Sequence, residues 1–302
     1  MCFIKYMKVS FNNFINNRVN LYALNPVRNQ NAQAKAPSFT GEDSFVKSTS
    51  SDSIYVQQMN ELFPNGSLDK IYAAINKEFG IDKPANLKLY GPSDGIQAGG
   101  YTFSKNEIGM SMQEFVDNNH KVVGIKDGKK YTIMTPDTKL PLFATKELCE
   151  GFVKAQQNSF KAIFDKLEVE PISKDEQRKF VLQRLAHEII HAQQHMIMRQ
   201  TSDIGEIEIE KAWTHYIPNT QSDVENFNKG ALKYHQTTYW GTQAPTVRTI
   251  PANSQIGQLA HTWLEAIRKY PPVDSPEYKT NAIEVDAYNR SYQYVVQRFG
   301  KY

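Results

Sequence analysis

The residues best suited to chemistry lie within one stretch of five, which reads His187-Glu188-Ile189-Ile190-His191. In a helix, four residues advance the chain by about 400°, so both imidazoles lie on one face, one turn apart. This spacing lets both rings reach a single zinc ion at about 2.0–2.1 Å. Glu188 lies at the edge of the same face, where it can take a proton from metal-bound water instead of binding the metal. The motif therefore predicts metal-assisted hydrolysis.

A long helix with a buried back is predicted around this motif. Ser173 and Glu176 have the spacing of a capping box, in which each side chain bonds the other residue's backbone amide at a helix start. We expect the helix to run from there to about Arg199. Apolar residues recur at helical spacing opposite the motif, which predicts a buried side: Leu182, Leu185, Ile189, Ala192 and Met196. A helix held by the core in this way presents the motif rigidly.

A catalytic zinc ion needs a third protein ligand besides two histidines. His195 lies one turn beyond His191, but reaching the same ion from three successive turns would strain a straight helix. We therefore expect His195 on the surface or behind a ligand. Glu206, Glu208 and Glu210 alternate with isoleucines, which is typical of a strand or a solvated face.

The motif extends to His187-Glu188-Ile189-Ile190-His191-Ala192-Gln193-Gln194, and in this form it resembles the HExxHxxQ sequences of zinc metallopeptidases of the zincin superfamily. The resemblance covers this helix and, more weakly, a helix near the C-terminus, and it identifies no single family. It implies a zincin fold, in which a sheet lies beside the active-site helix and substrate lies along an edge strand. Ile197 occupies the position of the third histidine of metzincins, so that branch is excluded.

Residues 281–288 resemble the glutamate-bearing helix of gluzincin-type peptidases, and this resemblance implies that Glu284 is the third zinc ligand. Ala287, one turn further, is the small residue that would let this helix approach the motif helix. The intervening residues 201–270 are then expected to cover the cleft. Glu284 also has capping-box spacing with Asn281, which is a purely structural alternative. Asp286 points about 200° away around the helix and is not expected to bind the same ion.

Stabilisation of a transition state requires a further hydrogen-bond donor near the metal. Tyr288 lies one turn from Glu284 on nearly the same face and is our candidate for this catalytic role. Three histidines are alternatives: His215, His235 and His261. Gln194, on the metal face, can either bond a metal ligand or hold substrate.

The rest of the chain predicts an α+β fold. The Asn- and Ser-rich residues 1–53 are expected to form a mostly disordered tail. A single domain follows at 54–302, with helices and a small, mostly antiparallel sheet in 54–145 and a helical part carrying the metal site in 146–302. Strands are predicted near 87–90, 101–104, 121–125, 131–135 and 140–144, with a hairpin turn at Asp127-Gly128. Further helices are predicted at 67–79 after a Ser67 cap, at 145–167 after a Thr145 cap, and at 254–268 and 281–299.

Composition narrows the classes of partner. The net charge of +3 and the lack of a basic run argue against nucleic acid and anionic membrane as partners.

Cys2 and Cys149 are the only cysteines, which argues against a disulfide-stapled fold and against cysteine metal ligands. No apolar stretch is long enough for a membrane span or a signal-peptide core. We therefore expect a cytoplasmic protein, or one exported without a cleaved signal.

Together these features predict a zinc-dependent metallopeptidase. Zn2+ would lower the pKa of its bound water and polarise the scissile carbonyl, while Glu188 moves the proton to the leaving amine. The resemblance implies a peptide or protein substrate. Two alternatives stay open: an inactive zincin-like binding protein whose metal is structural, and an interaction protein in which the motif is accidental.

Overall fold

The computed structural model describes residues 52–81, 84–94, 99–102, 106–134, 141–214, 220–237 (backbone only from 230), 249–271, 275 and 277–301. Of the tail predicted at 1–53, only Asp52 and Ser53 fall within this part, and the rest lies outside the described residues. Asp52 is buried and accepts a hydrogen bond from the Ser93 amide at 3.1 Å. The folded part of the chain therefore includes Asp52.

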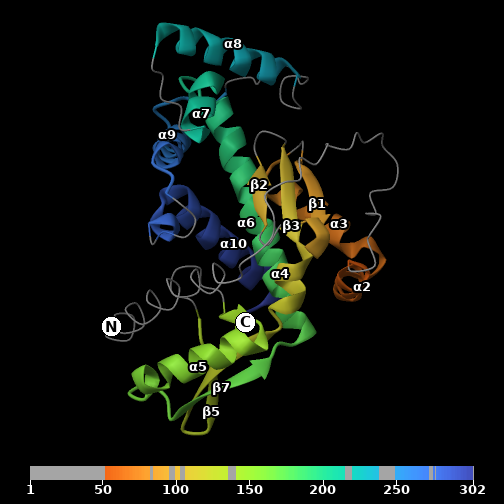
Figure 1. Ribbon diagram of the computed structural model, residues 1–302. Coiled ribbons are helices and arrows are strands. Elements are labelled where there is room, and N and C mark those ends of the chain that lie inside the picture. Colours follow the sequence, from red (N-terminus) through yellow and green to blue (C-terminus); the bar gives the residue numbers. More distant parts are fainter. Residues whose placement is uncertain are drawn as a thin grey trace.

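Helix α6 (Lys174–Gln200) runs through the middle of the molecule (Figure 1). It begins with the predicted capping box, in which the Ser173 hydroxyl accepts from the Glu176 amide and the Glu176 carboxylate accepts from the Ser173 amide. The predicted back of the helix is buried, except that the last of its residues is only partly so: Leu182, Leu185, Ile189, Ala192 and Met196. The core therefore fixes the orientation of α6 and of the face that carries the motif.

A three-stranded sheet lies against one side of α6 (Figure 1). Its strand order is β1 (Asn86–Tyr90), β3 (Glu107–Ser111), β2 (Gly100–Thr102), with β1 parallel and β2 antiparallel to β3. Three helices join this layer: α2 (Ser53–Leu62), α3 (Ser67–Glu78) and α4 (Met112–Asp117). These elements share the first core cluster with α6; its members include Ile75, Ile108, Phe115 and Leu185.

A second sheet lies at the opposite end of the molecule from α7, α8 and α9 (Figure 1). Its central strand, β4 (His120–Lys126), pairs antiparallel with β5 (Lys129–Thr132), β6 (Phe143–Ala144) and β7 (Lys166–Pro171). The predicted hairpin turn is confirmed between β4 and β5, where Asp127 and Gly128 have φ of 49° and 73°, as a type I′ turn requires. Helix α5 (Lys146–Phe160) begins at the predicted Thr145 cap, and it shares the second core cluster with this sheet.

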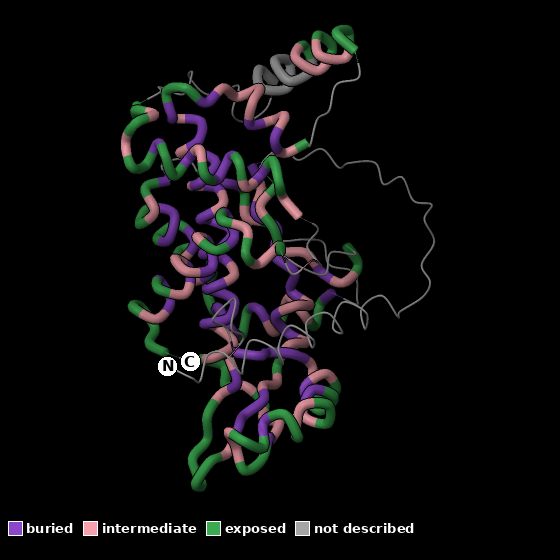
Figure 2. The backbone as a smooth tube through the Cα atoms, turned by 90° about the vertical axis from the view of Figure 1, so that its left-hand side faces the viewer, coloured by how far each residue is buried: buried purple, intermediate pink, exposed green. Residues whose placement is uncertain are grey.

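Within the described residues, four α-helices form the C-terminal part: α7 (Glu206–Trp213), α8 (Gln221–Thr237), α9 (Gln255–Arg268) and α10 (Ala282–Phe299). Helices α7 and α9 surround the C-terminal end of α6 in a third core cluster, which includes Met198, Ile209, Trp263 and Ile283. The described part of residues 201–270 thus packs on α6 and α10 in a shared core. Helix α10 packs along α6, and Figure 2 shows the buried positions gathered on the inner sides of these helices.

The helix predicted to continue to Leu167 ends at Phe160, and Leu167 lies in β7 instead. Ile163, Phe164 and Leu167 have helical spacing, but Leu167 and Val169 also have the two-residue period of a strand. Pairing with β4 along the whole length of β7, together with burial of Leu167 in the second core cluster, favours the strand.

Two other details of local structure differ from the expectation. Of the two possibilities for Glu206, Glu208 and Glu210, the strand is wrong: all three lie in helix α7, because the residues buried there, Ile209 and Ala212, are spaced by one helical turn. Ser67 does not cap α3, whose N-cap is Gly66 in a left-handed conformation.

The single sheet predicted from the sequence is two sheets, because α4 separates β3 from β4, and the β1–β3 pair is parallel. The α+β class itself is confirmed, and helix predominates. Within the described residues, no helix combines the length and the apolar character that crossing a bilayer demands.

Candidate metal centre

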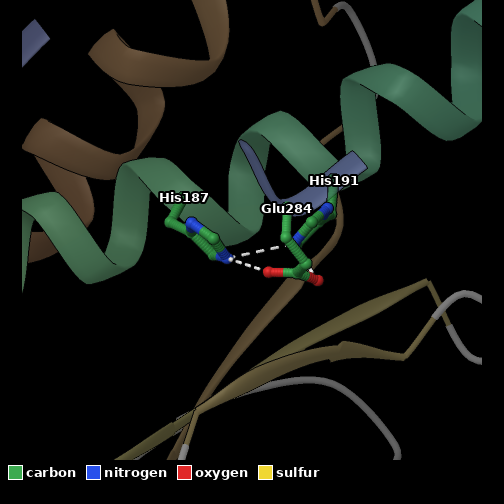
Figure 3. Close-up of side chains that lie close together, drawn as sticks. All are labelled: His187, His191 and Glu284. Carbon is green, nitrogen blue, oxygen red and sulfur yellow. Dashed lines mark hydrogen bonds and ion pairs between the residues drawn. The ribbon is translucent and has the colours of Figure 1, made fainter. Parts of the chain in front are cut away.

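The two histidines of the motif meet at one point in front of α6 (Figure 3). The Nε2 atoms of His187 and His191 are 3.0 Å apart, and their rings are perpendicular, with centroids separated by 4.6 Å. Both rings are largely buried. The one-turn spacing thus turns the same nitrogen of each ring toward a shared position, as a site for one ion requires.

Glu284, in the first turn of α10, points its carboxylate at the same position (Figure 3). Its Oε2 lies 3.3 Å from Nε2 of His187, and its Oε1 lies 3.4 Å from Nε2 of His191. The side chain is fully buried. The cap of α10 is made by Asn281 alone, whose side chain accepts from the Ile283 amide at 3.2 Å. Glu284 therefore takes the position expected of a ligand, and its carboxylate turns away from the cap.

The spacing of these three donors fits a tetrahedral ion. Ligand atoms about 2.0–2.1 Å from a tetrahedral zinc ion lie about 3.3 Å from each other. The observed separations are 3.0, 3.3 and 3.4 Å. In the described part of the chain, His187, His191 and Glu284 are the group whose ligand atoms all lie within 4.8 Å of one another. Two imidazoles and one carboxylate are also a ligand set that zinc uses in catalytic sites.

The charges of this cluster favour a cation beside Glu284. Burial raises the pKa of Glu284, but the two imidazoles outweigh it and hold that pKa well below its usual range. Burial lowers the pKa of His187, and the neighbouring His191 lowers it further. For His191, burial is outweighed by Glu284, which raises the pKa to about 9. The buried carboxylate thus stays ionised and needs a positive charge next to it, either a proton on His191 or a metal ion.

Tyr288 lies against the site from α10. Its ring centroid is 4.3 Å from that of His187, and the positive charge of Arg184 acts on its phenol. Burial raises the pKa of Tyr288 to about 12, although Arg184 opposes the shift. The phenol therefore stays protonated at neutral pH.

Arg184 was not a candidate from the sequence, although its spacing gives a signal: it lies one turn before Glu188 on the same side of α6. Its guanidinium forms an ion pair with Glu114 of α4 at 3.1 Å. The amide of Gly99, next to strand β2, donates to the same Glu114 carboxylate at 3.4 Å. Arg184 thus connects the edge of the first sheet to the metal face of α6.

Glu188 is buried beside the cluster but is not one of its three members. Its charge acts on both histidines, on Arg184 and on Tyr288. This position, near the ligands without joining them, is the one that a proton carrier needs.

Tyr270 is a site residue that no sequence pattern indicated. It follows the end of α9, and its hydroxyl donates to Oε1 of Glu284. The Tyr278 ring packs edge-on against it, with centroids 5.5 Å apart. Burial and the charge of Glu284 raise the pKa of both tyrosines. A hydrogen bond of this kind fixes the orientation of a ligating carboxylate.

The remaining candidates lie elsewhere or have other partners. His195 is buried, not on the surface, because β2 covers its side of α6 and brings Tyr101 to 6.3 Å between ring centroids. His261 pairs with Asp203 at 3.0 Å on the surface. His215 and the side chain of His235 lie outside the described residues.

The three glutamates of α7 lie outside the ligand cluster, and two of them form ion pairs with arginines. Glu206 pairs with Arg199 at 2.5 Å, and Glu208 pairs with Arg268. Burial raises the pKa of Glu210. None of the three belongs to the ligand cluster among the described residues.

The structure shows which of the two roles considered for Gln194 it takes. Its Oε1 lies 2.8 Å from Nδ1 of His191, so it bonds one of the candidate ligands on the ring side that faces away from Glu284. Its Nε2 donates to Asp286, so the Asp286 carboxylate is bonded to Gln194 and does not join the cluster of His187, His191 and Glu284.

Comparisons with protein-family models, with curated proteins and with solved structures gave no match for this chain. The interpretation of the site therefore depends on its own residues and their geometry.

Proposed function

We propose that this protein is a zinc-dependent hydrolase with a zincin-like fold, and that it cleaves peptides. The observation that carries the proposal is the spacing of three buried donors, His187, His191 and Glu284, at 3.0 to 3.4 Å from one another. Three protein donors favour a catalytic site over a structural one, since structural zinc sites use four and catalytic sites keep one position for water or substrate.

Each residue of the site has its own role in the proposed hydrolysis. His187, His191 and Glu284 would hold the ion, which when bound supplies a Lewis acid and lowers the pKa of a coordinated water. Glu188 removes a proton from the attacking water and delivers it to the leaving amine. Tyr288, kept protonated by its burial, donates a hydrogen bond to the developing oxyanion.

The first sheet supports a peptide substrate. Strand β2 is its edge strand and lies beside α6, and the structure pairs it only with β3 among the described strands. An edge strand offers unpaired backbone groups to which an extended peptide can add as a further strand. This arrangement of sheet edge and motif helix is also the one that the zincin resemblance implies.

The proposal is tested by Glu188→Gln in a peptide-library assay, with the zinc content of each protein measured in parallel. We expect wild type to cleave, and the variant to keep its zinc while losing activity by about 10²–10⁴-fold. Zinc without cleavage by wild type would favour the inactive binding protein. An absence of zinc in wild type would favour the accidental motif, and full activity in the variant would exclude Glu188 as the base.

A further inference from the structure

Gln194 is fully buried between α6 and α10, and both ends of its amide have partners. Its Nε2 donates to the carbonyl oxygen of Ile283 at 3.0 Å and to Oδ2 of Asp286 at 2.8 Å. Its Oε1 lies 2.8 Å from Nδ1 of His191. One side chain thus contacts a candidate metal-binding imidazole and two residues close to Glu284 in the first turns of α10, Ile283 before it and Asp286 two positions after it.

These partners determine which way the amide faces. The Ile283 carbonyl and the Asp286 carboxylate are acceptors, so the amide nitrogen must face them. The amide oxygen must then face His191, and because an oxygen only accepts, Nδ1 of His191 must carry the hydrogen. In the neutral ring this leaves the lone pair on Nε2, the atom that faces Glu284 and His187.

His187 has no corresponding support. Its Nδ1 is buried without a hydrogen-bond partner among the described residues, and the ring is held by contact with Tyr288. A ring contact orients an imidazole but does not select which nitrogen carries the proton. The two histidines therefore differ in how far the protein prepares them for a metal.

We propose that Gln194 is the positioning residue of the metal centre, fixing the Nδ1–H tautomer of His191 and tying the first turn of α10, with Glu284, to α6. A single amide would thereby set two of the three ligands. This inference depends on the proposed metal site and extends it to the residue that organises it. Hydrogen bonds behind ligating histidines typically contribute about 10–100-fold to metal affinity.

The neighbouring Gln193 offers a matched control. It is also a glutamine of α6 that bonds other elements: its Nε2 donates to the Phe79 carbonyl, and its Oε1 accepts from Arg290. Arg290 in turn pairs with Asp286 at 3.3 Å. Gln193 therefore joins helices as Gln194 does, without contacting a ligand in any hydrogen bond that the structure records.

The first experiment uses the unaltered chain. In protein labelled with nitrogen-15 in histidine and loaded with zinc, NMR should show His191 protonated at Nδ1 and coordinated through Nε2. Coordination through Nδ1, or a proton on Nε2, would overturn the proposal without any substitution.

The second experiment compares the zinc affinities of Gln194→Leu and Gln193→Leu by competition with a chromophoric chelator. We expect a loss of about 10–100-fold for the first and less than about threefold for the second. Equal losses of zinc affinity in the two leucine variants would contradict a role specific to Gln194.

Neither readout requires catalysis, so the two proposals fail separately. Wild type that binds zinc with the expected tautomer but cleaves nothing would refute the hydrolase and support the role of Gln194. Wild type that cleaves peptides, with Gln194→Leu holding zinc as tightly as Gln193→Leu, would refute only the role of Gln194.

Discussion

Glu284 is the residue on which the site depends most, since it is the only anion among the three candidate ligands. Its carboxylate is fully buried and reaches both imidazoles, while Tyr270 donates to one of its oxygens. A buried carboxylate without a cation beside it would be costly. The chemistry of this side chain thus requires the histidines or a metal next to it.

We predict that Glu284→Ala weakens zinc binding by at least about 100-fold, because one of three protein ligands is lost. The control is Glu208→Ala, which removes an exposed pair with Arg268 and should leave affinity within about twofold. Both can be measured by elemental analysis after dialysis against a graded chelator series. Equal zinc retention in the two variants would show that Glu284 is not a ligand.

Tyr288→Phe tests the oxyanion donor. We predict that kcat falls by about 10²–10³-fold, while zinc content and KM change little, because the ring contact with His187 is retained. Since the pKa of Tyr288 is about 12, the donor should be lost only as pH rises toward that value, and wild-type activity should show no loss from phenol ionisation between pH 7 and 10. Tyr131→Phe, an exposed tyrosine of the second sheet, is the control.

At the scale of elements, α6 was predictable because its signals are local. The capping box, the apolar back and the motif all lie within one helix, and all three are found. The errors arise where a short segment fits two periods, as with Leu167, or where the helix content of α7 depends on tertiary burial of Ile209. Strand β3 carries no alternating pattern, because four of its five residues are buried.

The packing of α10 on α6 leads to a prediction at this scale. Ala287 is completely buried one turn after Glu284, so Ala287→Leu should overpack the space between the helices. We expect a loss of about 1–3 kcal/mol of unfolding free energy and a weaker affinity for zinc. Val285→Leu, on the exposed side of the same helix, should change stability by less than about 0.5 kcal/mol. Denaturant titration of both variants, with and without zinc, compares them directly.

At the scale of the whole molecule, the site joins parts of the chain that the sequence places far apart. Tyr270 and Glu284 reach the histidines only because the helices of the third core cluster return the chain along α6 (Figure 1). No local pattern encodes this return, which is why Glu284 came from a resemblance and Tyr270 was not found. The second sheet, with a core cluster of its own, takes no part in these contacts.

Because the second sheet lies apart from the site, removal of zinc should change local stability near the site and not in that sheet. A ligand that binds only the folded state stabilises it by about 4 kcal/mol when present at about 1,000 times its Kd, and here the ion would connect α6 to α10. Chelation should therefore speed amide hydrogen exchange in residues 184–194 and 282–288, while the amides of β4 and β7, which pair in the second sheet, keep their rates. His191→Ala serves as the control, since chelator should leave its exchange pattern unchanged. An equal increase across both sheets, or an increase largest in β4 and β7, would mean that the ion stabilises the molecule from some other place than the contact between these two helices.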